Sequence, residues 1–485
     1  MTKETGNREY IEIAVQDIQL LTADQAWHYN VIPKEVRADT IIFYGEENTS
    51  TDQLVDELEM IFGKEVNISP LPKQILYDSL SRYYRRSNKD SELTDKQQTS
   101  FIEKSDDFVL RLIEEANEIG SSDIHIEKYE SKCRVRYRVD GKLVEKYIVS
   151  NEEYPSIVNK LKIMGNMAIV EKRLPQDGRI SFESNETKFD IRVSVLPTLF
   201  GEKVVMRLLS KDATDIDILN LGFSQNQLAS YLEGVKRTSG IVLISGPTGS
   251  GKTTTLYATL KELNNEKTNI ITIEDPIEYT LPGINQVQLK ESIGLTFAGA
   301  LRSFLRQDPD IIMLGEIRDV ETAKMAIRAA LTGHLVLSTI HTNSAWGTVS
   351  RLIDMGVPSY LISGTLNITA AQRLVRLLCD NCKQKVDIEI EQLPQSFKMP
   401  YEVHSVYEPV GCEACFYTGY AGRKALYEII PVDEEFSELI KAESFNVNAK
   451  IKEKKIERLM DNAFDLLANG STSIEEVYYL LMSTN

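Results

Sequence analysis

Short apolar runs alternate with helical patterns over the second half of the chain, from about residue 222 onward. Residues 241–245 form an apolar run of the length of a buried strand, and similar runs occur at residues 311–314 and 335–337. The segment at 269–279, NIITIEDPIEY, also begins with an apolar strand pattern, which Pro276 ends. Apolar strands separated by helices predict an α/β domain built on a doubly wound parallel sheet.

The beginning of the chain has a more mixed pattern. Residues 1–90 combine short strands, such as the one at 40–44, with a helical pattern at 54–63. We expect a small α/β module that contacts another protein. The stretch at 84–99 has many charges and no apolar periodicity, so we expect a linker here, which we place at residues 91–106.

A second mixed α/β domain is predicted between the linker and residue 211. A helix begins at about residue 107, and the strand pattern at 133–139 alternates in polarity before a hairpin turn at Asp140-Gly141. Two further strand patterns surround a turn at 197–201.

A glycine-rich loop follows the apolar run at 241–245. Its sequence GPTGSGKT matches the pattern G-x-x-x-x-G-K-[ST], and a helical sequence follows at once. Glycines let successive backbone N–H groups turn inward around a phosphate, at a helix N-terminus that adds attraction for negative charge. Lys252 would reach the β- and γ-phosphates, and Thr253 would ligate Mg²⁺. The predicted nucleotide-binding residues are Gly246, Pro247, Thr248, Gly249, Ser250, Gly251, Lys252, Thr253 and Thr254.

Two carboxylates come at the ends of predicted strands. Glu274 ends the strand that begins at 269, and Glu316 follows the run at 311–314. In a doubly wound sheet, both strands deliver these acids to the edge where the phosphate loop lies. We expect Glu316 to hold Mg²⁺ through water and Glu274 to orient or deprotonate the attacking water. Helix capping is the alternative role for a carboxylate at this position.

Four other polar residues stand within or beside apolar strand patterns. His341 follows the strand at 335–337 and is a candidate phosphate sensor, although a structural histidine is the common case there. Arg192 and Arg207 occupy strand patterns in which a charge requires a partner, unless they lie on an exposed strand face. We expect His125 to be structural.

Four of the five cysteines form two CxxC pairs. Cys379 and Cys382 are separated from Cys412 and Cys415 by the 29 residues 383–411, a spacing that suits tetrahedral Zn²⁺. A site with four cysteine ligands has no open position for substrate, so its role would be structural. We expect Cys133 to be a core residue.

Composition excludes some classes of partner. The 485 residues include 55 Lys and Arg against 72 Asp and Glu, a net charge of -17, which argues against extensive contact with nucleic acid. The N-terminal sequence lacks the apolar core of a signal peptide, and we find no apolar run of about 18 residues, so we expect a cytoplasmic protein.

From about residue 107 to its C-terminus, the chain resembles the secretion ATPases of type II secretion and type IV pilus assembly, the GspE/PilB type. The resemblance rests on motifs that occur in one order: SSDIHIE, LPQDGRI, RVSVLPTLFGEKVVMRLL, GPTGSGKTTTLY, TIEDPIEY, LRQDPDIIMLGEIRD, TGHLVLSTIHT, AQRLVRLLC and the paired CxxC. It implies a RecA-like P-loop domain, preceded by a PAS-like mixed α/β domain and a small N-terminal α/β domain.

The resemblance also implies roles for individual residues. Glu274 would be the catalytic carboxylate of the aspartate box, Glu316 the acid of the Walker B box, and His341 part of the histidine box. Arg192 and Arg207 match positions at which the upstream domain supplies arginines to the nucleotide phosphates. We find no RLGxxL repeat, so binding of a cyclic dinucleotide is not predicted.

The implied function is an ATP-driven motor for a pseudopilus or pilus. It would be a hexamer at the cytoplasmic face of the inner membrane, with an inner-membrane platform protein and a cytoplasmic adaptor as partners. A retraction motor is disfavoured, because retraction members generally lack the N-terminal domain and the cysteine pairs. An ATP-gated scaffold without turnover is disfavoured by the presence of Lys252, Glu274 and Glu316 together.

The predicted domains are an N-terminal partner-binding domain (1–90), a linker (91–106), an arginine-supplying domain (107–211), a RecA-like ATPase domain (222–375), a tetracysteine zinc subdomain (376–430) and a C-terminal helical region (431–485).

Overall fold

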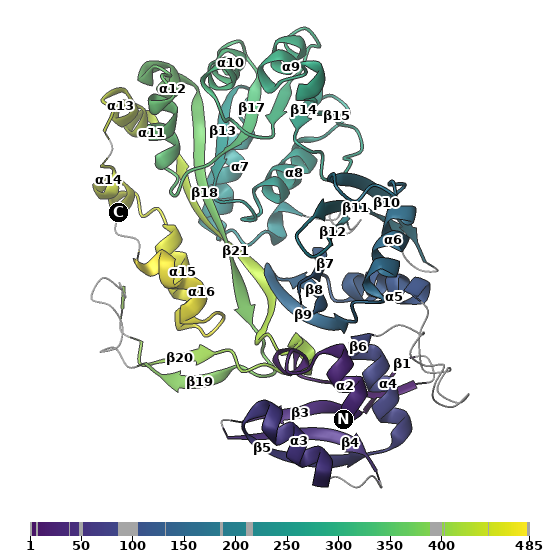
Figure 1. Ribbon diagram of the computed structural model, residues 1–485. Coiled ribbons are helices and arrows are strands. Elements are labelled where there is room, and N and C mark those ends of the chain that lie inside the picture. The colour runs from purple at the N-terminus through teal and green to yellow at the C-terminus, as the bar shows by residue number, and fades with distance from the viewer. Residues whose placement is uncertain are drawn as a thin grey trace. The chain divides into compact units, whose positions relative to one another are not determined.

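The computed structural model (Figure 1) describes residues 2–482, apart from 6–7, 38, 48–51, 86–104, 131, 185–187, 210–216, 389–399, 402 and 445. The chain divides into two compact units. The first contains residues 1–210 and 411–419, and the second contains residues 211–410 and 420–485. Among the described helices, none is long and apolar enough to cross a membrane.

The first unit begins with a small three-stranded sheet. Its central strand β4 (Thr40–Glu46) is antiparallel to β3 (Val31–Val36) and parallel to β5 (Glu65–Leu71). A separate antiparallel pair consists of β1 (Thr2–Thr5) and β2 (Arg8–Ile11). The helices of this region are α1 (Val15–Ile18), α2 (Ala23–Tyr29), α3 (Asp52–Phe62) and α4 (Lys73–Tyr83). The predicted strand at 40–44 and helix at 54–63 are therefore confirmed.

The polar stretch at 84–99 begins differently from our expectation. Tyr84 and Arg85 form the short strand β6, which pairs with β9 (Lys142–Val149). Tyr84 is fully buried, its hydroxyl donates to the carbonyl of Ile18, and its own carbonyl accepts a hydrogen bond from the indole of Trp27. A linker is thus the wrong interpretation for these two residues, because an aromatic ring completes the core. Residues 86–104 lie outside the described part of the chain.

A seven-stranded sheet forms the rest of the first unit, in the order β10-β11-β12-β7-β8-β9-β6. Its other strands are β7 (Asp123–Lys128), β8 (Cys133–Val139), β10 (Gln176–Glu183), β11 (Lys188–Pro197) and β12 (Glu202–Leu209). Helices α5 (Ser105–Glu118) and α6 (Tyr154–Met164) contribute to the hydrophobic core on one face of this sheet. The predicted hairpin is confirmed, since Asp140 and Gly141 connect β8 to β9 with positive φ angles of 47° and 85°.

The second unit contains the predicted parallel sheet, in the order β15-β14-β16-β17-β13-β18-β21. Neighbouring strands are parallel except for β18 and β21. The strands are β13 (Gly240–Ser245), β14 (Ile270–Glu274), β15 (Asn285–Gln288), β16 (Ile311–Leu314), β17 (Leu335–Ile340), β18 (Leu366–Leu378) and β21 (Tyr420–Pro431). The predicted α/β fold with a parallel sheet is confirmed.

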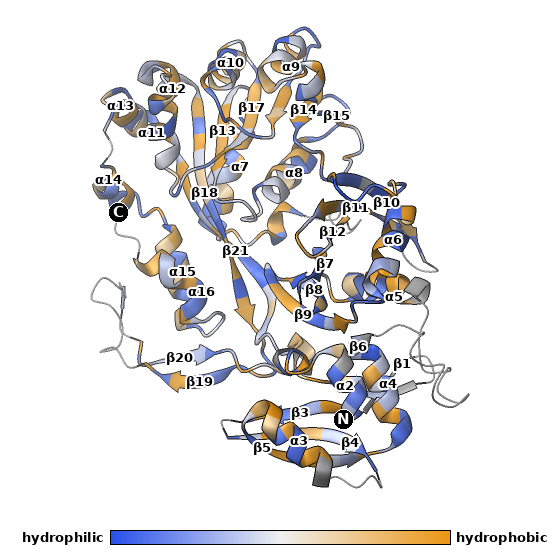
Figure 2. Ribbon diagram, in the orientation of Figure 1, coloured by the Kyte–Doolittle hydropathy of each residue, from blue (hydrophilic) through white to orange (hydrophobic). Residues whose placement is uncertain are grey.

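Apolar residues cover both faces of this sheet, as the continuous apolar runs require. In β13, Ile241 and Leu243 belong to one core, whereas Val242 and Ile244 belong to another. Figure 2 shows the central strands of the sheet as largely hydrophobic. The core that contains Val242 also includes residues of α7 (Gln225–Val235) and α8 (Lys252–Leu263). The core that contains Ile241 also includes residues of α9 (Phe297–Phe304), α10 (Val320–Leu331), α11 (Gly347–Asp354) and α12 (Ser359–Thr365).

The C-terminal part of the second unit is mainly helical. It contains α13 (Glu434–Lys441), α14 (Asn448–Glu453), α15 (Leu459–Ala468) and α16 (Ile474–Met482). Two short antiparallel strands, β19 (Gln384–Asp387) and β20 (Ser405–Glu408), lie in the sequence between the CxxC pairs.

Candidate functional site

The phosphate loop connects β13 directly to α8 (Figure 1). Gly251 precedes α8 in the left-handed conformation, with φ of 85°. Gly246 has φ of 152°, and a Cβ at this position would lie 2.5 Å from the carbonyl oxygen of Gln372. Only glycine fits these two positions, so the loop presents backbone rather than side chains at the N-terminus of α8.

Lys252 is the first residue of α8 and folds back over the loop. Its Nζ donates to the carbonyl oxygens of Gly246, at 2.9 Å, and Pro247, at 3.0 Å. Burial lowers the pKa of Lys252, and the nearby Glu316 carboxylate opposes this effect. The ammonium group therefore lies at the loop and within electrostatic reach of Glu316.

Glu316 lies just after β16, and its carboxylate contacts two residues at the same edge of the sheet. Its carboxylate accepts a hydrogen bond from Arg318 and lies 3.3 Å from Nε2 of His341, which follows β17. The hydrogen bond to Glu316 raises the pKa of Arg318, whose guanidinium also lies 3.8 Å from Asp275. The structure thus brings Lys252, Glu316 and His341 together. Our reading of the LGEIRD motif missed Arg318.

Glu274, the last residue of β14, is only 3% exposed. Three side chains donate hydrogen bonds to its carboxylate: Tyr257 from α8, Thr272 from β14 at 2.5 Å, and Gln286 from β15 at 3.1 Å. Sequence reasoning identified Glu274 but missed these donors. Tyr257 and Gln286 are 17 and 12 residues away in sequence, and no local motif marks them.

Strand β18 supports the phosphate loop from the neighbouring position in the sheet. Gln372 accepts a hydrogen bond from Thr255 Oγ1 at 2.9 Å. The guanidinium of Arg373 donates to the carbonyls of Gln372 and Asn343, both at 3.0 Å, and a Cβ at Gly246 would lie 3.3 Å from it. Burial lowers the pKa of Arg373. Sequence reasoning did not single out these β18 residues.

Arg192 and Arg207 lie in the first unit, on neighbouring strands and directly opposite each other. The side chain of Arg207 is 57% exposed, and its Nε lies 3.0 Å from Oδ1 of the buried Asp123. The same cross-strand row continues to Arg179 on one side and to Arg138 beyond Asp123. Residues in such a row share one face of a sheet. Four arginines and one aspartate therefore form a basic row on the face opposite the hydrophobic core.

His125 is buried on β7, and its two ring nitrogens have no hydrogen-bond partner among the described residues. Burial, with Lys203 and Arg138 nearby, lowers the pKa of His125. A neutral imidazole in this position is consistent with the structural role that we predicted.

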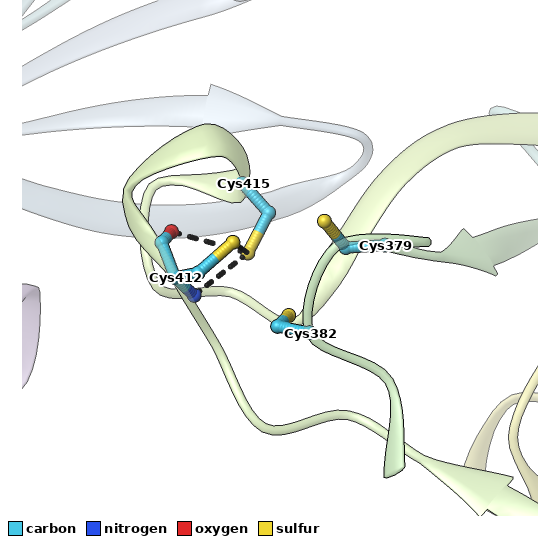
Figure 3. Close-up of side chains that lie close together, drawn as sticks. All are labelled: Cys379, Cys382, Cys412 and Cys415. Carbon is cyan, nitrogen blue, oxygen red and sulfur yellow. Dashed lines mark hydrogen bonds between the residues drawn. The ribbon is translucent and has the colours of Figure 1, made fainter.

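The four cysteines of the CxxC pairs lie together. Their sulfur atoms are all within 4.8 Å of one another, and Figure 3 shows them on two turns that face each other. Sγ of Cys412 and Sγ of Cys415 are 3.8 Å apart. Four sulfurs about 2.3 Å from one tetrahedral zinc would be about 3.8 Å apart, so the spacing fits. Backbone N–H groups of Cys412 and Gly419 also donate to Sγ of Cys415.

The fifth cysteine has a different environment. Cys133 is fully buried in β8, and burial raises the pKa of its thiol to about 11. A thiol with this pKa is unreactive at neutral pH, as expected for a core residue.

Three features define a P-loop nucleotide-binding protein: the parallel sheet, the loop at the N-terminus of α8, and the carboxylates at the end of β14 and just after β16. A family model described as Type II/IV secretion system protein matches residues 96–479. The chain belongs to this family, which confirms the resemblance seen in its motifs.

Relatives in this family include pilus and secretion proteins. The type IV pilus assembly ATPase PilB of Myxococcus xanthus is 41% identical over 503 residues, which cover 97% of this chain and 88% of PilB. The type II secretion system ATPase E of Vibrio cholerae is 45% identical over 79% of this chain and 77% of that protein.

Solved structures show a similar fold. The crystal structure of the pilus retraction motor PilT with bound ADP has a TM-score of 0.53 and 26% identity, over 78% of this chain and 97% of PilT. The Legionella pneumophila ATPase DotB, at 22% identity and a TM-score of 0.56 over 77% of this chain and 95% of DotB, shows likeness of fold alone.

Proposed function

We propose that this protein hydrolyses ATP to ADP and phosphate and thereby powers assembly of a type II secretion pseudopilus or a type IV pilus. The observation that supports this most is the set of Lys252, Glu274 and Glu316 around one sheet edge, in a chain 41% to 45% identical to ATPases of both machines. These two relatives are ATPases of a type IV pilus and of a type II secretion system, respectively, by their names.

In the proposed site, the backbone of residues 246–254 holds the phosphates of ATP and Lys252 binds the β- and γ-phosphates. Thr253 is the proposed Mg²⁺ ligand, and Glu316 holds the same ion through water. Mg²⁺ would neutralise charge on the phosphates. His341 contacts Glu316, so it can respond to the γ-phosphate and its metal.

Arg192 and Arg207 are the proposed arginines that reach the nucleotide phosphates when the two units close around ATP. Support comes from the basic row on an open sheet face, which is a local excess of positive charge in a chain of net charge -17. If closure depends on the γ-phosphate, ATP hydrolysis reverses the closure. Hydrolysis would in this way drive a rigid-body rotation. A hexameric ring would pass this rotation to its partners. The proposed partners are an inner-membrane platform protein and an adaptor, at the cytoplasmic face of the membrane.

The four-cysteine cluster is proposed to hold structural zinc. Cys379→Ser should lower the zinc content from about one ion per chain to none and lower the midpoint of thermal unfolding, because binding energy at such a site is also folding energy. Elemental analysis and calorimetry of protein purified under reducing conditions measure both effects.

Cys133→Ser is the matched control, because it makes the same chemical change at a buried cysteine outside the cluster. It should keep its zinc even if it loses stability. A wild-type chain without zinc, or a Cys379→Ser chain with full zinc content, would refute the assignment.

Cells that carry only a Glu316→Gln chain test the direction of the motor. We expect them to assemble neither pilus nor pseudopilus, because the Mg²⁺ site is lost. Electron microscopy that shows more surface pili than in wild-type cells would instead identify a retraction motor.

A further inference from the structure

The buried carboxylate of Glu274 accepts three hydrogen bonds from side chains. A carboxylate offers about four acceptor positions. Tyr257, Thr272 and Gln286 occupy three of them. About one position is left to accept a hydrogen bond from a water, and its direction is fixed by the three donors. This geometry suits a carboxylate that orients a water molecule.

Tyr257 is the donor that connects Glu274 to the phosphate loop. It lies in α8, five residues after Lys252, so Tyr257 belongs to the helix that begins where the phosphate loop ends. Its ring is 1% exposed and packs edge-on against Tyr279, with ring centroids 4.6 Å apart. Side-chain movement of Tyr257 is therefore restricted by the core.

The hydrogen of the Tyr257 hydroxyl has a defined direction. The hydroxyl oxygen accepts from the backbone N–H of Glu278 at 3.4 Å and from Nε2 of Gln286 at 3.5 Å. Its own hydrogen is then left for Glu274. Burial raises the pKa of Tyr257 well above its ordinary value, so the hydroxyl stays protonated and remains a donor.

We infer that Tyr257 is a positioning residue, which ties the carboxylate of Glu274 to the helix of the phosphate loop so that both keep a fixed relation to the γ-phosphate. This inference rests on the proposed role of Glu274 in ATP hydrolysis.

Tyr257→Phe should lower kcat about tenfold or more and leave KM for ATP nearly unchanged, because one hydrogen bond to a charged group is lost and the phosphate loop is intact. Steady-state phosphate release over a range of ATP concentrations measures both kcat and KM.

Tyr231→Phe is the matched control. Tyr231 is fully buried in the same core as Tyr257, and its hydroxyl pairs with Thr259 at 2.8 Å. Both variants lose one buried hydroxyl, so both should lose stability, but Tyr231→Phe should keep the wild-type kcat and KM. Equal kinetic effects in the two variants would overturn the inference.

The double variant Tyr257→Phe/Glu274→Gln tests whether Tyr257 affects hydrolysis through Glu274 or independently of it. If Tyr257 acts through Glu274, the double variant is no slower than Glu274→Gln alone. A further tenfold loss in the double variant would contradict this. Full activity of Glu274→Gln would instead remove the proposed role of Glu274 itself, so the two failures can be distinguished.

Discussion

Lys252→Ala should release phosphate from ATP at least about a hundredfold more slowly than the wild-type protein, while keeping its fold. The reason is electrostatic: the variant keeps the backbone N–H groups of the loop but loses the positive charge that meets the β- and γ-phosphates. Among the described residues, the side chain lost makes two hydrogen bonds, both to carbonyls of the same loop, so little stability depends on it. Phosphate release and thermal unfolding, measured on the same samples, check this prediction.

Lys261→Ala provides the control for this experiment. Lys261 is an exposed residue in the last turn of the same helix, so the control removes the same charge from α8 at a position away from the phosphate loop. The control should hydrolyse ATP at the wild-type rate. Near-normal phosphate release by a folded Lys252→Ala protein would refute the assignment of the active site.

Arg207→Ala should lose most ATP hydrolysis, by about 10³-fold, without losing nucleotide binding, because an arginine that stabilises the transferred phosphoryl group has an effect of this size. The fold should survive the change. Asp123, the buried partner of Arg207, keeps Arg138 at 3.4 Å and the hydroxyl of Ser122 at 2.8 Å. Phosphate release and equilibrium ATP binding are measured together.

Arg179→Ala is the matched control, since Arg179 lies in the same cross-strand row and is exposed at the edge strand β10. We expect it to keep most activity.

Sedimentation should show that the wild-type protein and both variants form hexamers with ATP and Mg²⁺. Monomers should hydrolyse ATP only weakly. Full activity of Arg207→Ala, or of a strictly monomeric wild-type protein, would rule out the proposed mechanism.

The sequence predicted the features that depend on residues that follow one another along the chain. The phosphate loop is a strand, a glycine-rich turn and a helix in immediate succession, so its pattern is complete within residues 241–263. The parallel sheet was predictable because both of its faces are buried, which requires continuous apolar runs such as Ile311–Leu314. The cysteine cluster was predictable because metal ligands leave a characteristic spacing.

The sequence did not predict contacts between segments that are far apart along the chain. Tyr257 and Gln286 surround Glu274 only because α8 and β15 pack beside β14. Arg373 lies beside Gly246 because β18 is the neighbour of β13, an order that no local pattern encodes. The basic row of Arg192 and Arg207 likewise depends on strand register. Arg192, Arg207 and Arg373 are charged residues among apolar neighbours, and this is the signal that the sequence offers for them. Tyr257 and Gln286 lie in elements with several polar residues, so no such signal marks them.

The measurement that tests the central claim most directly is phosphate release by the purified wild-type chain with ATP and Mg²⁺, compared with Glu274→Gln. The account predicts steady release that stops when Mg²⁺ is chelated and falls strongly in the variant, because Glu274 would orient the attacking water. Tight binding of ATP without phosphate release under all conditions, including those in which the protein sediments as a hexamer, would contradict the account and favour a nucleotide-gated scaffold.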